Sequence, residues 1–487
     1  MTWDVIVVGG GTSGSVLAAR LSEDPTRRVL LLEHGPDDAA YDSAVLDPVL
    51  AHTVWAGSTW VDRFTMHQAD SATDLSMLAG RVLGGTSAIN YLATLRGQPA
   101  DYDGWQLPGW SWADVGATFA TVETDLDHPD SPIHGHGGPL TVRRWKPDQH
   151  ASFQRAFLDG LQAVGVPHTA DVNDPTTLPG VGSFPATVVP ATGDRLTVSR
   201  AYLTSEVRAR DNLEIHCDTD VDRLVVEGDR VVGVAVGDDV IRADHVIVSA
   251  GAFGSPALLQ RSGIGPADVL RAASVDVIAD VPEVGENYQD HIGTVLLYVL
   301  SSPAPLPGGP AQPVWVDAAP DGTVDVHVFP TPLDGSSDTG ATSFALLVFL
   351  LKVSGRGRVA ITRDGVEIDA PIATADDVDR LAPVLDVLGR WEETEHFTSL
   401  GATRLAPGGS LRDPGAAQAA WATARTSYGH QVGTCAMGTV LDERCRVRAV
   451  DGLSVVDASS MPMIPAGNTY LGCVMVAERV AQLFSSS

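Results

Sequence analysis

The stretch from Asp4 to Glu33 constrains the fold most strongly, because it joins two apolar runs through closely spaced glycines. Residues 5–8 (VIVV) and 29–32 (VLLL) are short and unbroken, as in strands buried on both faces of a parallel sheet. The turn between them contains Gly9, Gly11, Thr12, Ser13 and Gly14, followed by a helical segment at 15–21. This order predicts a dinucleotide site: the glycines admit a pyrophosphate at a helix N-terminus, and Glu33 can accept from ribose hydroxyls. It does not identify the dinucleotide.

Composition limits the partners of the chain. A net charge of −29 over 487 residues disfavours binding to nucleic acid or to an anionic membrane surface. No run of 18 apolar residues occurs, so we expect no transmembrane segment. The first strand begins near Asp4, so we expect no signal peptide. The four cysteines (Cys217, Cys435, Cys445 and Cys473) have no CxxC spacing and predict free thiols in a reducing cytoplasm.

A second glycine-rich segment spans residues 80–93 (GRVLGGTSAINYLA). Its double glycine and small polar residues suit the close approach of a ring or a phosphate, although an ordinary capped turn has the same composition. Upstream, the apolar residues of 36–76 follow no sustained helical or strand period, and we expect this stretch to run over the surface. Downstream, a loop contains His128, His134 and His136. Because no second group of ligands accompanies this His-x-His pair, we expect polar surface histidines and no metal.

The rest of the chain alternates strand and helix signals. Strands are expected at 213–216, 221–226, 231–236, 246–248, 324–329, 343–353, 357–361 and 453–456, and helices near 151–165, 257–260, 376–398 and 470–484. The first three strands predict a small antiparallel ribbon. The last helix is apolar nearly all round at 471–477, so it must be buried. The most linker-like stretch is 301–313 (SSPAPLPGGPAQP).

Several further motifs occur in order along the chain: GRVLGGTSAIN, AGAFGSPALLQRSGIGP, VGENYQDH, HQVGTCAMG and VVDASSMPMIPAGNTY. Together with the opening GGGTSG they resemble the glucose–methanol–choline (GMC) flavoprotein oxidoreductases over essentially the whole chain. The resemblance implies FAD as the dinucleotide and an α/β fold, with a Rossmann-like FAD-binding domain. It implies an α+β substrate-binding domain on a six-stranded antiparallel sheet. We expect the FAD-binding domain at 1–140, 200–293 and 424–487, and the substrate-binding domain at 141–199 and 294–423.

The resemblance also assigns roles to residues. It places the pyrophosphate at Gly9, Gly11 and Gly14 and the ribose at Glu33. Further cofactor contacts are implied at Val82, Gly85, Asn90, Tyr91, Leu92, Ala93, Val221, Asp457, Ala458 and Thr469. His430 and Asn468 match the catalytic pair. Residues 80–96 contain no histidine or cysteine that could form a covalent flavin link, so we expect non-covalent FAD.

The chemistry of alcohol oxidation fits this pair. A histidine that titrates near neutrality can take the hydroxyl proton while a hydride leaves the carbon for flavin N5, and a neighbouring amide can orient the hydroxyl. The N-terminus of the last helix would stabilise negative charge on reduced flavin if it points at the ring. We expect Thr469 to cap that helix, which leaves the Asn468 side chain free. Tyr428 and Gly429 precede His430 where the family usually has an aromatic residue directly before the histidine.

The leading hypothesis is an FAD-dependent oxidase or dehydrogenase for a primary, secondary or aryl alcohol or a sugar hydroxyl. The electron acceptor would be oxygen, a quinone or another carrier. The alternatives are a GMC-fold lyase that keeps FAD as a structural group and a mycofactocin-type dehydrogenase that passes electrons to a respiratory carrier. An NAD-dependent dehydrogenase and a non-catalytic flavin-binding protein also remain open. A second GxGxxG for NADPH is absent.

Overall fold

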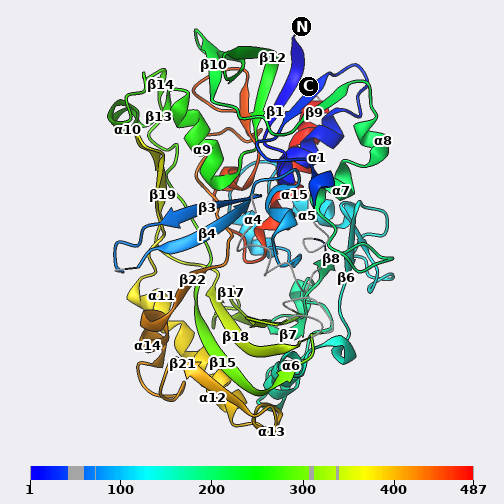
Figure 1. The fold of residues 1–487 in the computed structure, drawn as a ribbon, viewed down its shortest axis with the longest axis vertical. Helices are drawn as coiled ribbons and strands as arrows, with labels where there is room; N and C mark the ends of the chain where they lie inside the picture. The colour runs from blue at the N-terminus through cyan, green and yellow to red at the C-terminus, as the bar shows by residue number, and fades with distance from the viewer. Residues whose placement is uncertain are drawn as a thin grey trace.

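The computed structural model describes residues 2–41, 46, 60–71, 73–306, 312–335 and 339–485. Parts of the predicted surface excursion (42–45, 47–59 and 72) and of the linker-like stretch (307–311) lie outside the described residues. Figure 1 shows an elongated molecule with one large sheet near each end, and both chain termini lie beside the same sheet. Within the described ranges, no helix combines the length and apolarity needed to cross a membrane.

The sheet beside the termini contains the predicted dinucleotide-binding unit. Its order is β10-β11-β12-β1-β2-β9, and β23 also pairs with β12, near the carboxyl end of that strand. The strands are β1 (Trp3–Val8), β2 (Val29–Leu32), β9 (Leu213–His216), β10 (Arg223–Glu227), β11 (Arg230–Val236), β12 (Asp239–Val248) and β23 (Leu453–Val455). β1, β2, β9, β12 and β23 run parallel, and the apolar runs of β1, β2, β12 and β23 are almost wholly buried. Helices α1 (Thr12–Leu21) and α15 (Thr469–Ser485) belong to the same core.

One strand of this sheet differs from the prediction. Residues 213–216 were expected to open an antiparallel ribbon, but β9 pairs in parallel with β2. Only β10, β11 and β12 form antiparallel pairs. The hydrophobic pattern indicates a strand correctly, but it contains no information on the direction of the partner strand.

The second large sheet is antiparallel throughout. Its order is β21-β15-β18-β17-β16-β7, with β22 beside β15. The strands are β7 (Gly180–Ser183), β15 (Ile292–Ala304), β16 (Pro313–Ala318), β17 (Val324–Pro332), β18 (Ala341–Leu350), β21 (Ala402–Ala406) and β22 (Arg425–Ser427). One face packs on α6 (Ser152–Ala163), α12 (Leu381–Glu392), α13 (Glu395–Thr398) and α14 (Ala416–Thr423). The other face carries Phe329 and Phe349 and packs on Leu95 and Ala466, so it faces the cofactor-binding motifs.

Smaller elements connect the two sheets. They include β3 (Val61–Met66), β4 (Leu75–Gly80), β5 (Glu123–Asp125), β6 (Leu140–Arg143), β8 (Ala186–Thr187), β13 (Ile264–Gly265), β14 (Ala279–Asp280), β19 (Arg358–Ile361) and β20 (Val366–Asp369). The short helices include α4 (Pro99–Asp103), α5 (Trp112–Thr121), α7 (Val198–Tyr202), α8 (Ser205–Arg208), α9 (Gly251–Arg261), α10 (Ala267–Ala272) and α11 (Ala375–Asp379). The β3–β4 hairpin shows that the stretch at 36–76, expected to run over the surface, contains regular structure that its sequence pattern did not indicate.

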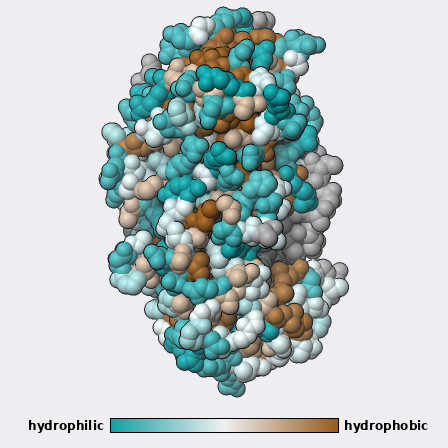
Figure 2. All heavy atoms as spheres, turned by 90° about the vertical axis from the view of Figure 1, so that its left-hand side faces the viewer, coloured by the Kyte–Doolittle hydropathy of each residue, from teal (hydrophilic) through white to brown (hydrophobic). Residues whose placement is uncertain are grey.

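The face of the molecule in Figure 2 is mostly hydrophilic, with apolar atoms in separate areas. This agrees with the strongly acidic composition, which disfavours a broad apolar surface. The cysteines of the described residues are free thiols, and Cys435, Cys445 and Cys473 are buried.

Candidate active site

The turn after β1 combines glycines that the fold requires with one that leaves room for a ligand. Gly9 has φ +99°, and a Cβ on it would lie 2.5 Å from the Ser249 carbonyl oxygen. A Cβ on Gly14 would lie 1.8 Å from the Gly9 carbonyl oxygen. A Cβ on Gly11 would meet nothing closer than Gly85 Cα at 3.9 Å. The space above Gly11, at the start of α1, therefore fits the pyrophosphate of a dinucleotide.

Glu33 closes this turn from the end of β2. Its two carboxylate oxygens accept from the backbone N–H groups of Gly10 (2.7 Å) and Gly35 (2.8 Å). The side chain is buried, and burial raises the pKa of the carboxyl group. Each oxygen keeps a second lone pair, so the group can hold the turn and still accept from a ribose hydroxyl.

The second glycine-rich segment lies directly against the first. Gly84 N–H donates to the Gly10 carbonyl oxygen at 2.8 Å, and a Cβ on Gly85 would lie 2.7 Å from Gly11 Cα. Val82 is fully buried beside them. Two stretches that the sequence separates by about 70 residues thus form one backbone-lined cradle.

The residues predicted to line the flavin follow this cradle. Asn90 Oδ1 accepts from Leu92 N–H (3.0 Å) and from the Arg195 guanidinium (2.8 Å). Leu92 has φ +60°, Tyr91 packs on Phe329, and Ala93 forms an isolated bridge with Ala186. Arg195 is fully buried, and burial lowers its pKa to about 10. Sequence reasoning missed Arg195, because no motif surrounds it.

Asp457 lies two residues after the end of β23 and organises the loop before α15. One oxygen accepts from Gly251 N–H (2.8 Å) and Ser255 Oγ (2.5 Å), and the other accepts from Ser459 N–H (2.8 Å). Burial raises its pKa. Ala458 begins the short 3-10 helix that follows, and Ser13 Oγ donates to the Cys473 carbonyl oxygen, which joins α1 to α15. Thr12 is the first residue of α1, and Val221 lies partly buried before β10, against the core of the parallel sheet.

His430 and Asn468 meet in the buried space between the two sheets. His430 Nε2 lies 3.2 Å from Asn468 Nδ2, and Asn468 Oδ1 accepts from Leu95 N–H at 3.0 Å. Helix α15 begins at Thr469, so Thr469 lies inside the helix instead of capping it from outside, and Asn468 occupies the capping position. The Asn468 side chain nevertheless points at His430 and Leu95. Burial and the neighbouring His327 lower the His430 pKa to about 3, which keeps the imidazole neutral.

Two residues of the VGENYQDH motif complete this arrangement, and sequence reasoning gave neither a role. His291 Nδ1 lies 2.8 Å from His430 Nδ1. Asp290 accepts from the His430 backbone N–H at 2.9 Å and from Ser427 Oγ. Burial raises the Asp290 pKa to about 6. The signal was present in the motif itself, whose adjacent Asp and His carry chemistry that a purely structural turn does not need.

Aromatic rings form a wall beside His430. Tyr428 lies 4.1 Å from the His430 ring centroid and stacks on Phe349 at 4.1 Å with an interplanar angle of 11°. Phe329 lies 5.4 Å from Tyr428, and the fully buried His327 meets Tyr428 edge-on. Burial lowers the pKa of His327 to about 3. The described neighbours of the His430 ring are therefore aromatic rings, neutral imidazoles and the Asn468 amide.

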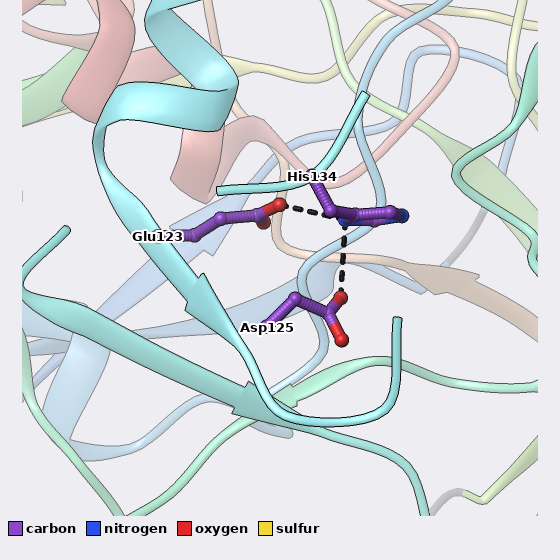
Figure 3. Close-up of side chains that lie close together, drawn as sticks. All are labelled: Glu123, Asp125 and His134. Carbon is purple, nitrogen blue, oxygen red and sulfur yellow. Dashed lines mark hydrogen bonds and ion pairs between the residues drawn. The ribbon is translucent and has the colours of Figure 1, made fainter. Parts of the chain in front are cut away.

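The prediction of surface histidines at 128–136 is wrong for His134, whose side chain is fully buried. Figure 3 shows His134 between Glu123 and Asp125, and its Nδ1 lies 2.7 and 3.1 Å from their carboxylate oxygens. Nε2 lies 2.7 Å from Asp171 Oδ2. Arg96 binds Glu123, and Arg144 binds both aspartates. With protonated His134, three cations balance three carboxylates, so the cluster forms a neutral ion network.

A nucleotide cradle on a parallel sheet and a buried histidine–asparagine pair under an antiparallel sheet define a dinucleotide-dependent oxidoreductase. Residues 3–293 match the N-terminal model and residues 356–477 the C-terminal model of the GMC oxidoreductases. The chain is 31% identical to 5-(hydroxymethyl)furfural oxidase of Methylovorus sp. strain MP688, over 98% of both chains. It is 32% identical to an oxygen-dependent choline dehydrogenase of Burkholderia thailandensis, over 98% of this chain and 93% of the relative.

Among solved structures, the crystal structure of pyridoxine 4-oxidase from Mesorbium loti superposes with a TM-score of 0.90. It is 30% identical, and all of both chains is covered. The chain therefore belongs to the GMC oxidoreductase family. The predicted fold class is confirmed, and so is the predicted enzyme class, an FAD-dependent oxidoreductase of the GMC type that acts on CH–OH groups.

Proposed function

We propose that this enzyme oxidises a small, uncharged alcohol with a planar ring, that His430 is the base and that Asn468 orients the hydroxyl. The observation that carries the proposal is the convergence of His430 Nε2 and Asn468 Nδ2 at 3.2 Å beside the aromatic wall of Tyr428 and Phe349. An alcohol oxygen that replaces the direct contact between the two nitrogens would donate its proton to Nε2 and accept from the amide N–H.

The protein groups prepare this reaction in three ways. The lowered pKa of His430 keeps Nε2 unprotonated and able to accept the hydroxyl proton. Asn468 can stabilise the oxygen as negative charge develops on it. Burial excludes water that would compete for both groups. When bound, FAD supplies the acceptor for the hydride that leaves the alcohol carbon.

The aromatic wall supports the substrate class. Tyr428 and Phe349 stack on each other beside the base, and an aromatic wall favours a planar ring over an aliphatic chain. The fixed negative charge nearest to His430 is Asp290, whose oxygens are already committed to backbone and hydroxyl donors. A quaternary ammonium alcohol would therefore have to rely on cation–π attraction to the aromatic rings, without a free carboxylate. Relatives named for hydroxymethylfurfural and pyridoxine fit this proposal better than those named for choline.

We also propose that FAD binds without a covalent link and that oxygen or a quinone reoxidises it. FAD would lie across the cradle of Gly9, Gly11, Gly14 and Gly85, with Asp457, Ala458 and the start of α15 at its flavin end. The proposed cofactor domain comprises 1–140, 200–293 and 424–487. The strands of the parallel sheet support this division, although β22, just after its last boundary, pairs with the substrate-side sheet.

Anaerobic stopped-flow spectroscopy tests the proposal. We expect aromatic primary alcohols to bleach the flavin absorbance, and choline to do so at least about tenfold less efficiently. His430→Ala should slow flavin reduction by about 10²-fold or more, whereas the exposed control His136→Gln should not. A near-normal rate in His430→Ala would remove the base assignment. An alcohol substrate that leaves the flavin oxidised while turning over would instead identify a lyase.

A further inference from the structure

The ring of His430 is bonded at both of its nitrogens, and the chain of contacts continues beyond each of them. On one side it runs from Nε2 to Asn468 Nδ2 and from Asn468 Oδ1 to Leu95 N–H. On the other side Nδ1 lies 2.8 Å from His291 Nδ1. His291 and Asn468 are both buried, so neither can exchange these partners for bulk water at no cost.

The donors and acceptors in this series of contacts permit one arrangement of protons. The Leu95 backbone N–H can only donate, so the atom of Asn468 that faces it must be the carbonyl oxygen. The amide NH₂ of Asn468 therefore faces His430 Nε2, which must present a lone pair. A neutral imidazole with a lone pair on Nε2 carries its proton on Nδ1. Because Nδ1–H of His430 donates, His291 Nδ1 must accept, and the proton of His291 lies on its Nε2.

We propose that His291 is a positioning residue that holds His430 in the tautomer with its proton on Nδ1, so that Nε2 presents the lone pair with which it acts as the base. This inference rests on the proposed role of His430. The opposite tautomer would place a proton on Nε2 against the Asn468 NH₂ group and would leave no base for the alcohol. The backbone of His430 is fixed separately, by Asp290.

His291 also acts during proton transfer. As the substrate O–H bond breaks and the Nε2–H bond forms, His430 becomes an imidazolium ion with protons on both nitrogens. Its Nδ1–H then makes a charge-assisted hydrogen bond to the His291 lone pair. This bond is stronger than the one that the neutral His430 ring donates before proton transfer. In a buried site this bond is a main source of stabilisation for the new cation, because solvation by water is absent.

The surroundings keep His291 neutral and able to accept. Burial, together with His430, His327 and Lys352, holds its pKa well below the usual value, and the Pro465 backbone opposes that shift. Tyr428 faces the His291 ring at 6.0 Å, and burial raises the Tyr428 pKa, so the phenol stays neutral. Asp290 is the neighbouring carboxyl group, and it bonds to the His430 backbone instead of to either ring.

The test compares His291→Asn with His291→Leu in the FAD-loaded enzyme. The Oδ1 atom of asparagine can take the place of histidine Nδ1 as an acceptor, whereas leucine has no polar atom. We expect flavin reduction to slow by about 10²-fold in His291→Leu and by less than about tenfold in His291→Asn, with the loss in kcat and not in KM. His245→Leu is the control, since His245 bonds to Ser454 within the parallel sheet, away from this pair.

A second readout does not depend on turnover. Nitrogen-15 NMR of histidine-labelled holoenzyme distinguishes protonated from unprotonated ring nitrogens. We expect Nδ1 of His430 to be protonated in the wild type and in His291→Asn, and the tautomers to mix in His291→Leu. A proton on Nε2 in the wild type, or equal rates in the asparagine and leucine variants, would overturn the proposal. If His430→Ala proved fully active while the NMR matched the expectation, the base assignment would fail and the tautomer assignment would stand.

Discussion

His134 offers the sharpest quantitative prediction, because its charge is fixed by contacts that the structure measures. Burial alone would disfavour the charged ring, but the hydrogen bonds to Asp171 and Glu123 outweigh burial and raise the pKa from 6.5 to about 9. Each tenfold change in proton affinity corresponds to about 1.4 kcal/mol, so protonated His134 contributes about 3 kcal/mol to the free energy of unfolding. His134→Gln should remove this contribution.

The pH dependence has a defined sign. The folded-state pKa is higher than the unfolded value of 6.5, so the contribution is fully present below pH 6.5 and is lost as the pH rises through about 9. With an unfolding entropy of about 2 cal/mol/K per residue, 487 residues give about 1 kcal/mol/K, and 3 kcal/mol corresponds to about 3 °C in Tm. Differential scanning fluorimetry of the holoenzyme between pH 6 and pH 10 measures this difference.

The comparison needs a matched control, and the same loop provides one. His136 is exposed, so His136→Gln should shift Tm by less than about 1 °C at every pH. The Tm difference between the wild type and His134→Gln should be largest at pH 6 and should disappear by about pH 10. A difference that stays constant with pH would mean that the variant loses packing and not charge, and would refute the reasoning.

Two further predictions follow from the site. Gly11→Ala should leave Tm of the apoprotein within about 1 °C but weaken FAD binding in a fluorescence titration, since its Cβ meets no protein atom closer than 3.9 Å. Gly14→Ala should not fold, because its Cβ would overlap the Gly9 carbonyl. Wild-type FAD affinity in Gly11→Ala would argue against the cradle. The rate of flavin reduction should stay level as the pH falls from 8 to 5, because burial and His327 lower the His430 pKa to about 3. A loss of rate centred near pH 6.5 that persists in Asp290→Asn would contradict this.

Local patterns in the sequence predicted the parts of the fold that local forces determine. The unit from β1 to β2 follows from two apolar runs and three glycines, and α15 follows from a segment that is apolar all round. The ion network around His134 could not be predicted in this way. Its partners Glu123 and Asp125 lie on β5 and Asp171 lies on a separate segment, and only the folded chain brings three carboxylates to one imidazole. An exposed loop and a buried network have the same local composition.

The active site shows the same limit, and the structure explains it through strand register. Ile292 at the start of β15 pairs with Ser427 at the end of β22, and the Tyr428 N–H donates to the His291 carbonyl oxygen at 2.9 Å. The residues just before β15 and just after β22 must therefore lie side by side, which brings His291 to His430 across 139 residues. β22 is three residues long, too short for a hydrophobic period to indicate it. The sequence thus names both histidines within its motifs, but the contact between them depends on a pairing that only the folded sheet defines.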